Sequence, residues 1–232
     1  MKKPTLVLGI LILAMDSTQA GTVTTNTAAP TVDGADIAML DLTGSSGQGK
    51  FWAGEGFAAG QTFTTESAPG GYLLNAATIR YFGAYDPNNQ ATEFDPTKTY
   101  GVRVVTLSDT TITQLLDEAF VHSSAARAGD YLTFELNSPF ALFPDAVYGF
   151  DVRMTASTSG WQTGIPQITY RSDNYAGGEY YICSQWTDGN RGNWSPTDLA
   201  LAIPTASRDW VFHLDIEEHI EERPTGAMVL VR

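Results

Sequence analysis

The chain has few of the side chains that form disulfides or bind polyanions. Cys183 is the only cysteine among 232 residues, so no disulfide can form within the chain. Lys and Arg together number 13 against 26 Asp and Glu, which gives a formal net charge of −13. Nucleic acids and anionic membranes are bound through clustered basic side chains. We therefore expect neither partner, and a fold that depends on its apolar core alone.

The usual motifs of enzymes are also missing. Neither GxSxG, HExxH, CxxC nor a phosphate-binding GxxxxGK[ST] loop occurs. Of the three histidines, His122 and His219 stand alone, so the sequence offers no zinc site. Cys183 has Tyr181 and Ile182 beside it and no basic neighbour that would favour a thiolate. We expect it to be a small buried side chain rather than a reactive thiol.

The first twenty residues have the pattern of a secretory signal peptide. Lys2 and Lys3 precede an apolar run from Leu6 to Met15, and small residues stand at Thr18 and Ala20. The run is too short for a membrane span, although a buried strand or an uncleaved anchor is the alternative. The sequence thus predicts export to the cell surface or the medium. The mature protein would start at Gly21 and contain no membrane span.

Alternating side chains over residues 129–154 give the strongest structural signal. Leu132, Phe134 and Leu136 fall on one side of the first run, and Phe150 and Val152 share one side of the second. A period of two is typical of half-buried strands. The two runs are separated by turn residues, so we expect neighbouring antiparallel strands with one dry and one wet face.

Shorter runs of the same kind extend through the chain. We expect a flexible lead-in over 21–35, one domain over 36–217 and an acidic tail over 218–232. A frayed first strand is the alternative for Gly21 to Pro30. Thr99 to Leu107 and Thr111 to Phe120 flank a tight turn and predict a hairpin. No long helix is expected. The fold class predicted from these patterns is all-β, an antiparallel β-sandwich that is jelly-roll-like and has about nine or ten strands.

Five segments carry a resemblance to a known family. They are GQTFTT (60–65), PGGYLLNAATIR (69–80), AGDYLTFELNSPFALFPDAVYGFDV (128–152), YRSDNYAGGEYY (170–181) and SRDWVFHLDIE (207–217). Together they resemble a secreted bacterial β-sandwich family found among PEP-CTERM (exosortase-sorted) exoproteins and large surface proteins. The resemblance implies a fold and an extracellular setting, and no catalytic group. The sorted members end in Pro-Glu-Pro, an apolar span and a basic cluster, whereas only five apolar residues, 227–231, precede the last residue here.

A secreted β-sandwich with aromatic side chains in its loops suggests a glycan-binding surface. Sugars stack their C–H faces on exposed rings, and Asn, Asp and Arg supply directional hydrogen bonds. Burial in the core is the competing role for each aromatic residue. The candidate ligand-binding residues are Trp161, Tyr175, Tyr180, Trp186, Asn190, Arg191 and Trp194.

A polar loop is the one candidate for a metal site. Oxygen-rich side chains at Asp86, Asn88, Glu93 and Asp95 could hold calcium, although their spacing does not match a full calcium loop. No other cofactor is expected.

The last strand offers the one suggestion of catalysis. His213, Asp215 and Glu217 alternate with apolar residues, much as the Glu-x-Asp-x-Glu motif of laminarinase-type glucanases does. An imidazole at the nucleophile's position does not fit retaining hydrolysis, which needs two carboxylates. We therefore expect a non-catalytic secreted or cell-surface module for adhesion or glycan binding, with polysaccharide or extracellular matrix as its partner. A glycan-active hydrolase and a purely structural exoprotein are the alternatives.

Overall fold

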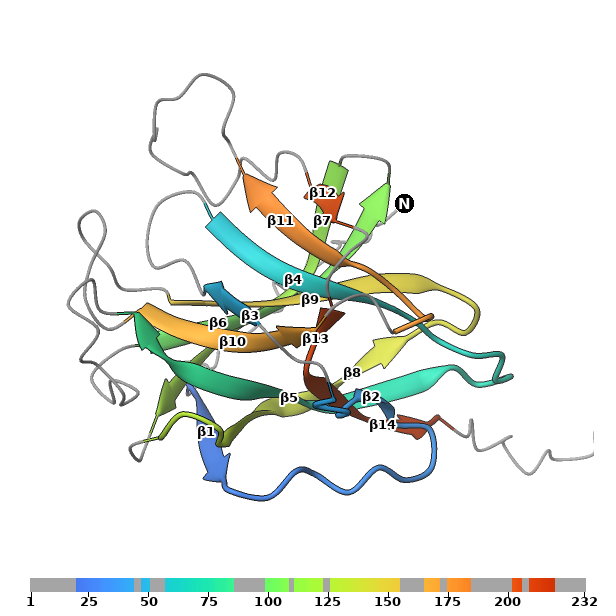
Figure 1. Cartoon of the computed structure of the whole chain (residues 1–232). Helices are drawn as coiled ribbons and strands as arrows, with labels where there is room; N and C mark the ends of the chain where they lie inside the picture. The colour runs from blue at the N-terminus through green and yellow to red at the C-terminus, as the bar shows by residue number, and fades with distance from the viewer. Residues whose placement is uncertain are drawn as a thin grey trace, which may run out of the picture.

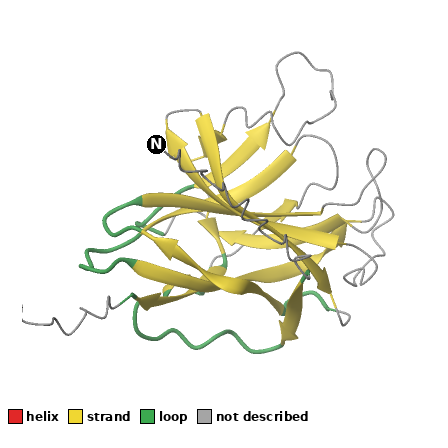
Figure 2. Cartoon of the chain, turned by 180° about the vertical axis from the view of Figure 1, so that it is seen from behind, coloured by secondary structure: helices red, strands yellow, loops and turns green. Residues whose placement is uncertain are grey.

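The structure, a computed structural model, describes residues 20–43, 47–50, 57–85, 99–108, 111–122, 126–154, 165–171, 175–184, 202–205 and 209–219 (Figure 1). Within these ranges every regular element is a strand, as Figure 2 shows, so the predicted all-β class is confirmed. None of the described segments forms a helix with the length and apolarity that a membrane crossing requires. Cys183 is part of a strand, but its side chain lies outside the described atoms.

Fourteen strands are present in the described ranges. They are β1 (Gly21–Asn26), β2 (Ile37–Met39), β3 (Gly47–Lys50), β4 (Phe57–Thr64), β5 (Tyr72–Tyr85), β6 (Thr99–Ser108), β7 (Thr111–His122), β8 (Tyr131–Leu142), β9 (Val147–Met154), β10 (Ile165–Arg171), β11 (Tyr180–Ser184), β12 (Ala202–Thr205), β13 (Asp209–Trp210) and β14 (Phe212–Glu218). The sequence predicts nine or ten. The additional strands include the short β3, β12 and β13, which have two to four residues each.

The strands follow one hydrogen-bonded path in the order β12-β11-β4-β9-β6-β7-β1-β8-β5-β10-β13. Off this path, β14 pairs with β5 and β2, and β3 pairs with β10. The path curls into a half-barrel, so β4 and β11 occupy the upper half of Figure 1 while β5 and β14 occupy the lower half. The predicted hairpin is confirmed, since β6 and β7 pair antiparallel from Thr99 to Ser108.

The first strand corrects two predictions. β1 lies between β7 and β8, and it runs parallel to β7 with Gly21 opposite Phe120. The sheet is therefore mixed rather than purely antiparallel. Over Gly21–Asn26 the flexible lead-in gives way to its alternative, a first strand, because backbone hydrogen bonds hold this segment on both sides and Val23 is fully buried.

The two strands with the clearest alternation are not neighbours. β8 pairs with β1 and β5, whereas β9 pairs with β4 and β6. The prediction of an adjacent antiparallel pair is wrong because the connection crosses from one half of the curled sheet to the other. Asp145 has a positive φ of 52° in this connection, and its N–H donates to the carbonyl of Glu66 at 3.1 Å.

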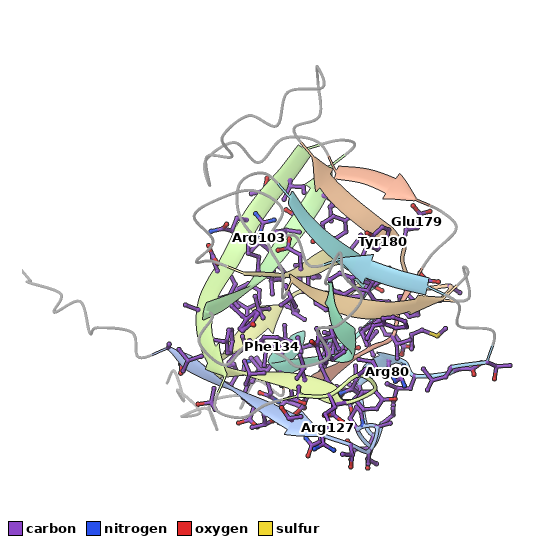
Figure 3. All side chains as sticks on the ribbon, turned by 60° about the vertical axis from the view of Figure 1, so that its left-hand side comes forward. Arg80, Arg103, Arg127, Phe134, Glu179 and Tyr180 are labelled. Carbon is purple, nitrogen blue, oxygen red and sulfur yellow. The ribbon has the colours of Figure 1, made fainter. Side chains whose placement is uncertain are left out.

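Aromatic side chains join the two halves of the sheet through one core. Phe150 of β9 packs against Trp210 and Phe212, with ring centroids 5.4 Å apart in both pairs. Phe134 of β8 meets Phe120 of β7 edge to face, also at 5.4 Å, inside the curled sheet (Figure 3). Burying large rings from both halves supplies much of the apolar area that a fold without disulfides needs.

A polar cluster is buried on the other side of β9 from Phe150. Arg103 and Asp151, at 1% and 0% exposure, form an ion pair, and the hydroxyl of Tyr181 donates to Asp151 at 3.0 Å. The predicted wet face is wrong here, because the Tyr181 ring lies across Gly60 and Gly149 and covers this part of the sheet. A side chain at either glycine would overlap that ring.

Candidate functional site

Tyr175 is half-buried and stands just before β11, beside two surface cavities. Its N–H donates to Oδ2 of Asp209 at 2.8 Å, and its ring meets that of Phe212 edge to face at 5.2 Å. Burial raises the pKa of the Tyr175 hydroxyl to about 12; a hydrogen bond with the Thr64 backbone opposes this rise, and the Asp209 carboxylate adds to it. The side chain is thus a neutral phenol in a fixed position.

The segment from Tyr175 to Glu179 is fastened to β4. Thr62 N donates to the carbonyl of Glu179 at 2.8 Å, and Thr64 Oγ1 donates to the carbonyl of Gly177 at 2.9 Å. Gly177 and Gly178 permit this close approach, since a Cβ at Gly178 would overlap the Thr62 carbonyl. These contacts give the cavity wall a fixed shape before any ligand arrives.

The larger cavity has a volume of about 390 Å³, which is within the usual range for small-ligand pockets. It is bounded by β2 and the residues before it, the end of β4, the start of β5, the Tyr175 segment and the end of β14. The lining residues are Gly34, Ala35, Asp36, Ile37, Ala38, Thr64, Thr65, Glu66, Tyr72, Tyr175, Gly177, Ile216 and Glu218. A second cavity of about 360 Å³ shares Thr64, Tyr175 and Gly177 with it.

Tyr72 contributes a second phenol to the larger cavity. Its side chain is only 5% exposed, yet among the described residues none forms a hydrogen bond with its hydroxyl. Burial raises the pKa of Tyr72, and the carboxylates of Glu218, Glu66 and Asp145 raise it further. Glu66 and Glu218 line the cavity themselves, so the Tyr72 hydroxyl lies on the cavity side of a covered ring.

Asp36 is part of the cavity wall but is already occupied. Its Oδ2 lies 2.9 Å from Nε2 of His213, and its Oδ1 accepts a hydrogen bond from the Ile216 N–H at 3.0 Å. Burial alone would raise the pKa of Asp36, but hydrogen bonds from the backbone of Asp33 and Ile216 and from His213 outweigh it and lower the pKa. Asp36 therefore holds β14 in place rather than facing a ligand.

The predicted ligand-binding residues have different outcomes. Tyr175 lies at the cavities, as described above. Tyr180 is 4% exposed and packs against Trp210 at 6.4 Å, so its ring belongs to the core, while its neighbour Glu179 is exposed (Figure 3). The other predicted ligand residues lie outside the described residues; they are Trp161, Trp186, Asn190, Arg191 and Trp194.

The last strand does not present its polar groups as a set. His213 is 5% exposed and bonded to Asp36, whereas Asp215 and Glu217 are exposed. His213 is therefore separated from the other two, because β2 and the residues before it cover that position. Asp215 accepts a long hydrogen bond, 3.4 Å, from the side chain of Asn75.

No metal centre is found in the part of the chain that the structure describes, where no three His, Cys, Asp or Glu side chains are grouped to hold an ion. The predicted calcium loop lies outside the described residues; its members are Asp86, Asn88, Glu93 and Asp95.

Three cavity residues were not predicted from the sequence. Tyr72 follows the Pro-Gly-Gly turn, Glu66 follows β4, and Glu218 falls in the predicted acidic tail. Glu66 and Tyr72 flank one turn, whereas Glu218 is far away in the chain and joins them because β5 pairs with β14, which places Tyr72 opposite Glu218. No local pattern signals such a meeting.

The comparisons with known proteins identify no family. A scan against protein-family models gives no match, and a search of curated proteins gives none either. Among solved structures, the chain is similar to the cysteine protease and lectin-like domains of Cwp84, a surface layer associated protein of Clostridium difficile. The TM-score is 0.43 and the identity 11%, over 81% of this chain and 37% of that chain. A likeness of this size carries no argument about function.

Proposed function

We propose that the chain is a non-catalytic, exported β-module that binds a glycan in the cavity beside Tyr175 and acts at the cell surface or in the medium. The observation that carries this proposal is the cavity of about 390 Å³, which is lined by two tyrosines and by the exposed Glu66 and Glu218. A few convergent polar groups beside aromatic side chains are typical of sugar sites.

The chemistry of the cavity suits a saccharide. Glu66 and Glu218 offer carboxylate oxygens that accept hydrogen bonds from sugar hydroxyls, and the Tyr72 hydroxyl can donate or accept one. Tyr175 adds apolar ring surface. The Tyr175 segment is fastened to β4 at Thr62 and Thr64, so little ordering is needed on binding.

The scaffold suits an exported module in the same way. The two halves of the curled sheet face each other across one core and would serve as the two layers of a sandwich-like fold. Export is supported by the signal-peptide pattern of residues 1–20 and by the resemblance to secreted β-sandwich exoproteins. The exposed positions of Asp215 and Glu217, and the engagement of His213 by Asp36, give the hydrolase alternative no support.

Binding of the purified chain to a panel of immobilised polysaccharides tests the proposal. We expect at least one polysaccharide to retain the protein. Tyr175→Ala should weaken this binding about tenfold, because the ring surface is lost. Tyr175→Phe should retain binding because the ring is kept. Phe82→Ala removes another exposed aromatic side chain on β5 that does not line the cavity, and it serves as the control.

Two outcomes would contradict the proposal. In the first, no immobilised polysaccharide retains the folded wild-type chain. The other is retention that Tyr175→Ala leaves unchanged while Phe82→Ala weakens it, since the binding surface would then lie elsewhere. A thermal unfolding curve for each variant establishes that the fold is intact.

A further inference from the structure

The side chains around the larger cavity carry charge of one sign only. Glu66 and Glu218 line it, and the Asp36 carboxylate stands in its wall. None of its described lining residues is Lys, Arg or His. Within the described ranges, Glu66 and Glu218 also form no ion pair of their own. Asp36 differs from them, because His213 and two backbone N–H groups already engage it.

Tyr72 supplies an independent indication that this cavity takes a ligand. Its ring is 95% covered, its hydroxyl has no hydrogen-bond partner among the described residues, and its side chain lines the same cavity. The hydroxyl is not among the fully buried polar atoms without a partner, so it reaches solvent and can form a hydrogen bond with a ligand that enters the cavity. The raised pKa of Tyr72 keeps the hydroxyl protonated and uncharged, so its oxygen is an acceptor that carries no charge.

The groups that await a partner in the cavity are therefore mainly acceptors, and two of them are anionic. A neutral sugar hydroxyl donates one hydrogen bond, whereas a protonated amino group donates three and carries the opposite charge. Hydrogen bonds between ionised partners are about twice as strong as neutral ones. Resting on the glycan-binding function proposed above, we infer that the cavity selects glycans that carry a protonated amino group, with Glu66 and Glu218 as its charge partners and Tyr72 as a neutral acceptor.

The net charge of the chain makes a local test necessary. At −13, the protein attracts any polycation over its whole surface, and salt screens this attraction. Binding in a selective cavity differs from this background in one respect. It is lost when two particular carboxylates, Glu66 and Glu218, are neutralised, and it persists when two other carboxylates are. Glu135 and Asp215 provide the matched comparison, because they are exposed as Glu66 and Glu218 are, neither lines the cavity, and their neutralisation removes the same number of charges.

The experiment measures binding of the purified chain to two oligosaccharides of equal length by calorimetry. One is a hexamer of β-1,4-linked glucosamine, which carries free amines, and the other is its fully N-acetylated counterpart. We expect the amine hexamer to bind at least about tenfold more tightly. Glu66→Gln/Glu218→Gln should remove this preference, Glu135→Gln/Asp215→Asn should retain it, and Tyr72→Phe should weaken amine binding several-fold.

Five outcomes would overturn the inference. Equal affinity for the two hexamers leaves a glycan-binding module without amine selectivity, so the inference fails while the proposed function stands. If neither hexamer nor any panel polysaccharide binds, both fail. Equal losses in the two double variants, or full competition by poly-L-lysine, assign the binding to overall charge. Binding that requires added calcium and disappears with chelator assigns the carboxylates to a metal site instead.

Discussion

The guanidinium of Arg103 and the carboxylate of Asp151 are joined by two parallel hydrogen bonds inside the protein. Nε donates to Oδ1 at 2.8 Å, and Nη2 donates to Oδ2 at 2.7 Å. The Tyr181 hydroxyl donates to the same Oδ2 at 3.0 Å. The three residues lie on β6, β9 and β11, so this polar cluster ties together the upper half of the curled sheet.

Removing one charge of this pair should be far more costly than removing an exposed charge. Asp151→Asn leaves the Arg103 cation buried, and we expect a loss of about 3–5 kcal/mol in the free energy of unfolding, measured by urea denaturation. Tyr181→Phe removes one hydrogen bond and should cost about 1 kcal/mol. Glu135→Gln is the exposed control. A loss for Asp151→Asn as small as that of the control would show that the pair does not stabilise the sheet.

Gly60 is required by the ring that lies over it. A Cβ at this position would overlap the Tyr181 ring and would lie 2.5 Å from the carbonyl oxygen of Phe150. Because backbone cannot move aside cheaply, Gly60→Ala should lower the free energy of unfolding by about 1–3 kcal/mol. Urea denaturation measures this loss. An unchanged midpoint would mean that β4 and β11 are spaced more widely than described here.

Asp36 should make the protein sensitive to acid. Its pKa in the folded state lies below the ordinary value of 3.8, so as pH falls the unfolded chain takes up the proton first. The contact is therefore stabilising above about pH 3.8, and this contribution is lost as the pH falls further. Thermal unfolding midpoints between pH 2 and pH 6 should decline less steeply in Asp36→Asn than in the wild type.

Glu118 should contribute to stability with the opposite pH dependence, which the same experiment measures. Burial raises the pKa of Glu118 above 4.5, and a hydrogen bond from the Asn137 backbone opposes the rise only in part. Its protonated form is favoured in the fold, so its contribution is present below pH 4.5 and is lost as the pH rises through the folded pKa. Glu118→Gln should remove this loss. Parallel pH curves for both variants and the wild type would contradict the two assignments.

The stability of the turn between β8 and β9 should depend on which residue replaces Asp145. Its φ of 52° lies in the left-handed region, which glycine adopts freely and which asparagine and aspartate tolerate. We expect Asp145→Ala to be about 1 kcal/mol less stable than Asp145→Gly in urea denaturation. Asp145→Asn should resemble the wild type. Equal stabilities for the alanine and glycine variants would be inconsistent with this backbone conformation.

The sequence predicts which side of a strand a residue occupies better than it predicts what lies over that side. Leu132, Phe134 and Phe150 alternate as expected and are buried. Asp151 alternates as expected too, but its side of β9 is covered by Tyr181 from a strand thirty residues later. Alternation reports the geometry of one strand, while burial depends on a partner that the strand itself does not encode.

Strand pairing and the candidate site were harder to predict for the same reason. β1 is held by backbone hydrogen bonds, which a Thr-rich segment forms as well as an apolar one, so Gly21–Asn26 gave no signal of its central position. Tyr175 was predicted as a ligand residue from its type and its loop. Tyr72, Glu66 and Glu218 join it only because the start of β5 lies beside the ends of β4 and β14.

The position of β1 also governs how the protein can be assembled and cut. Both neighbours of this strand, β7 and β8, follow it in the chain. Without β1 between them, β7 and β8 have no hydrogen-bonded partner on that side. The six residues Gly21–Asn26 thus form an inner strand of the half-barrel, and trimming them would split the sheet rather than shorten it.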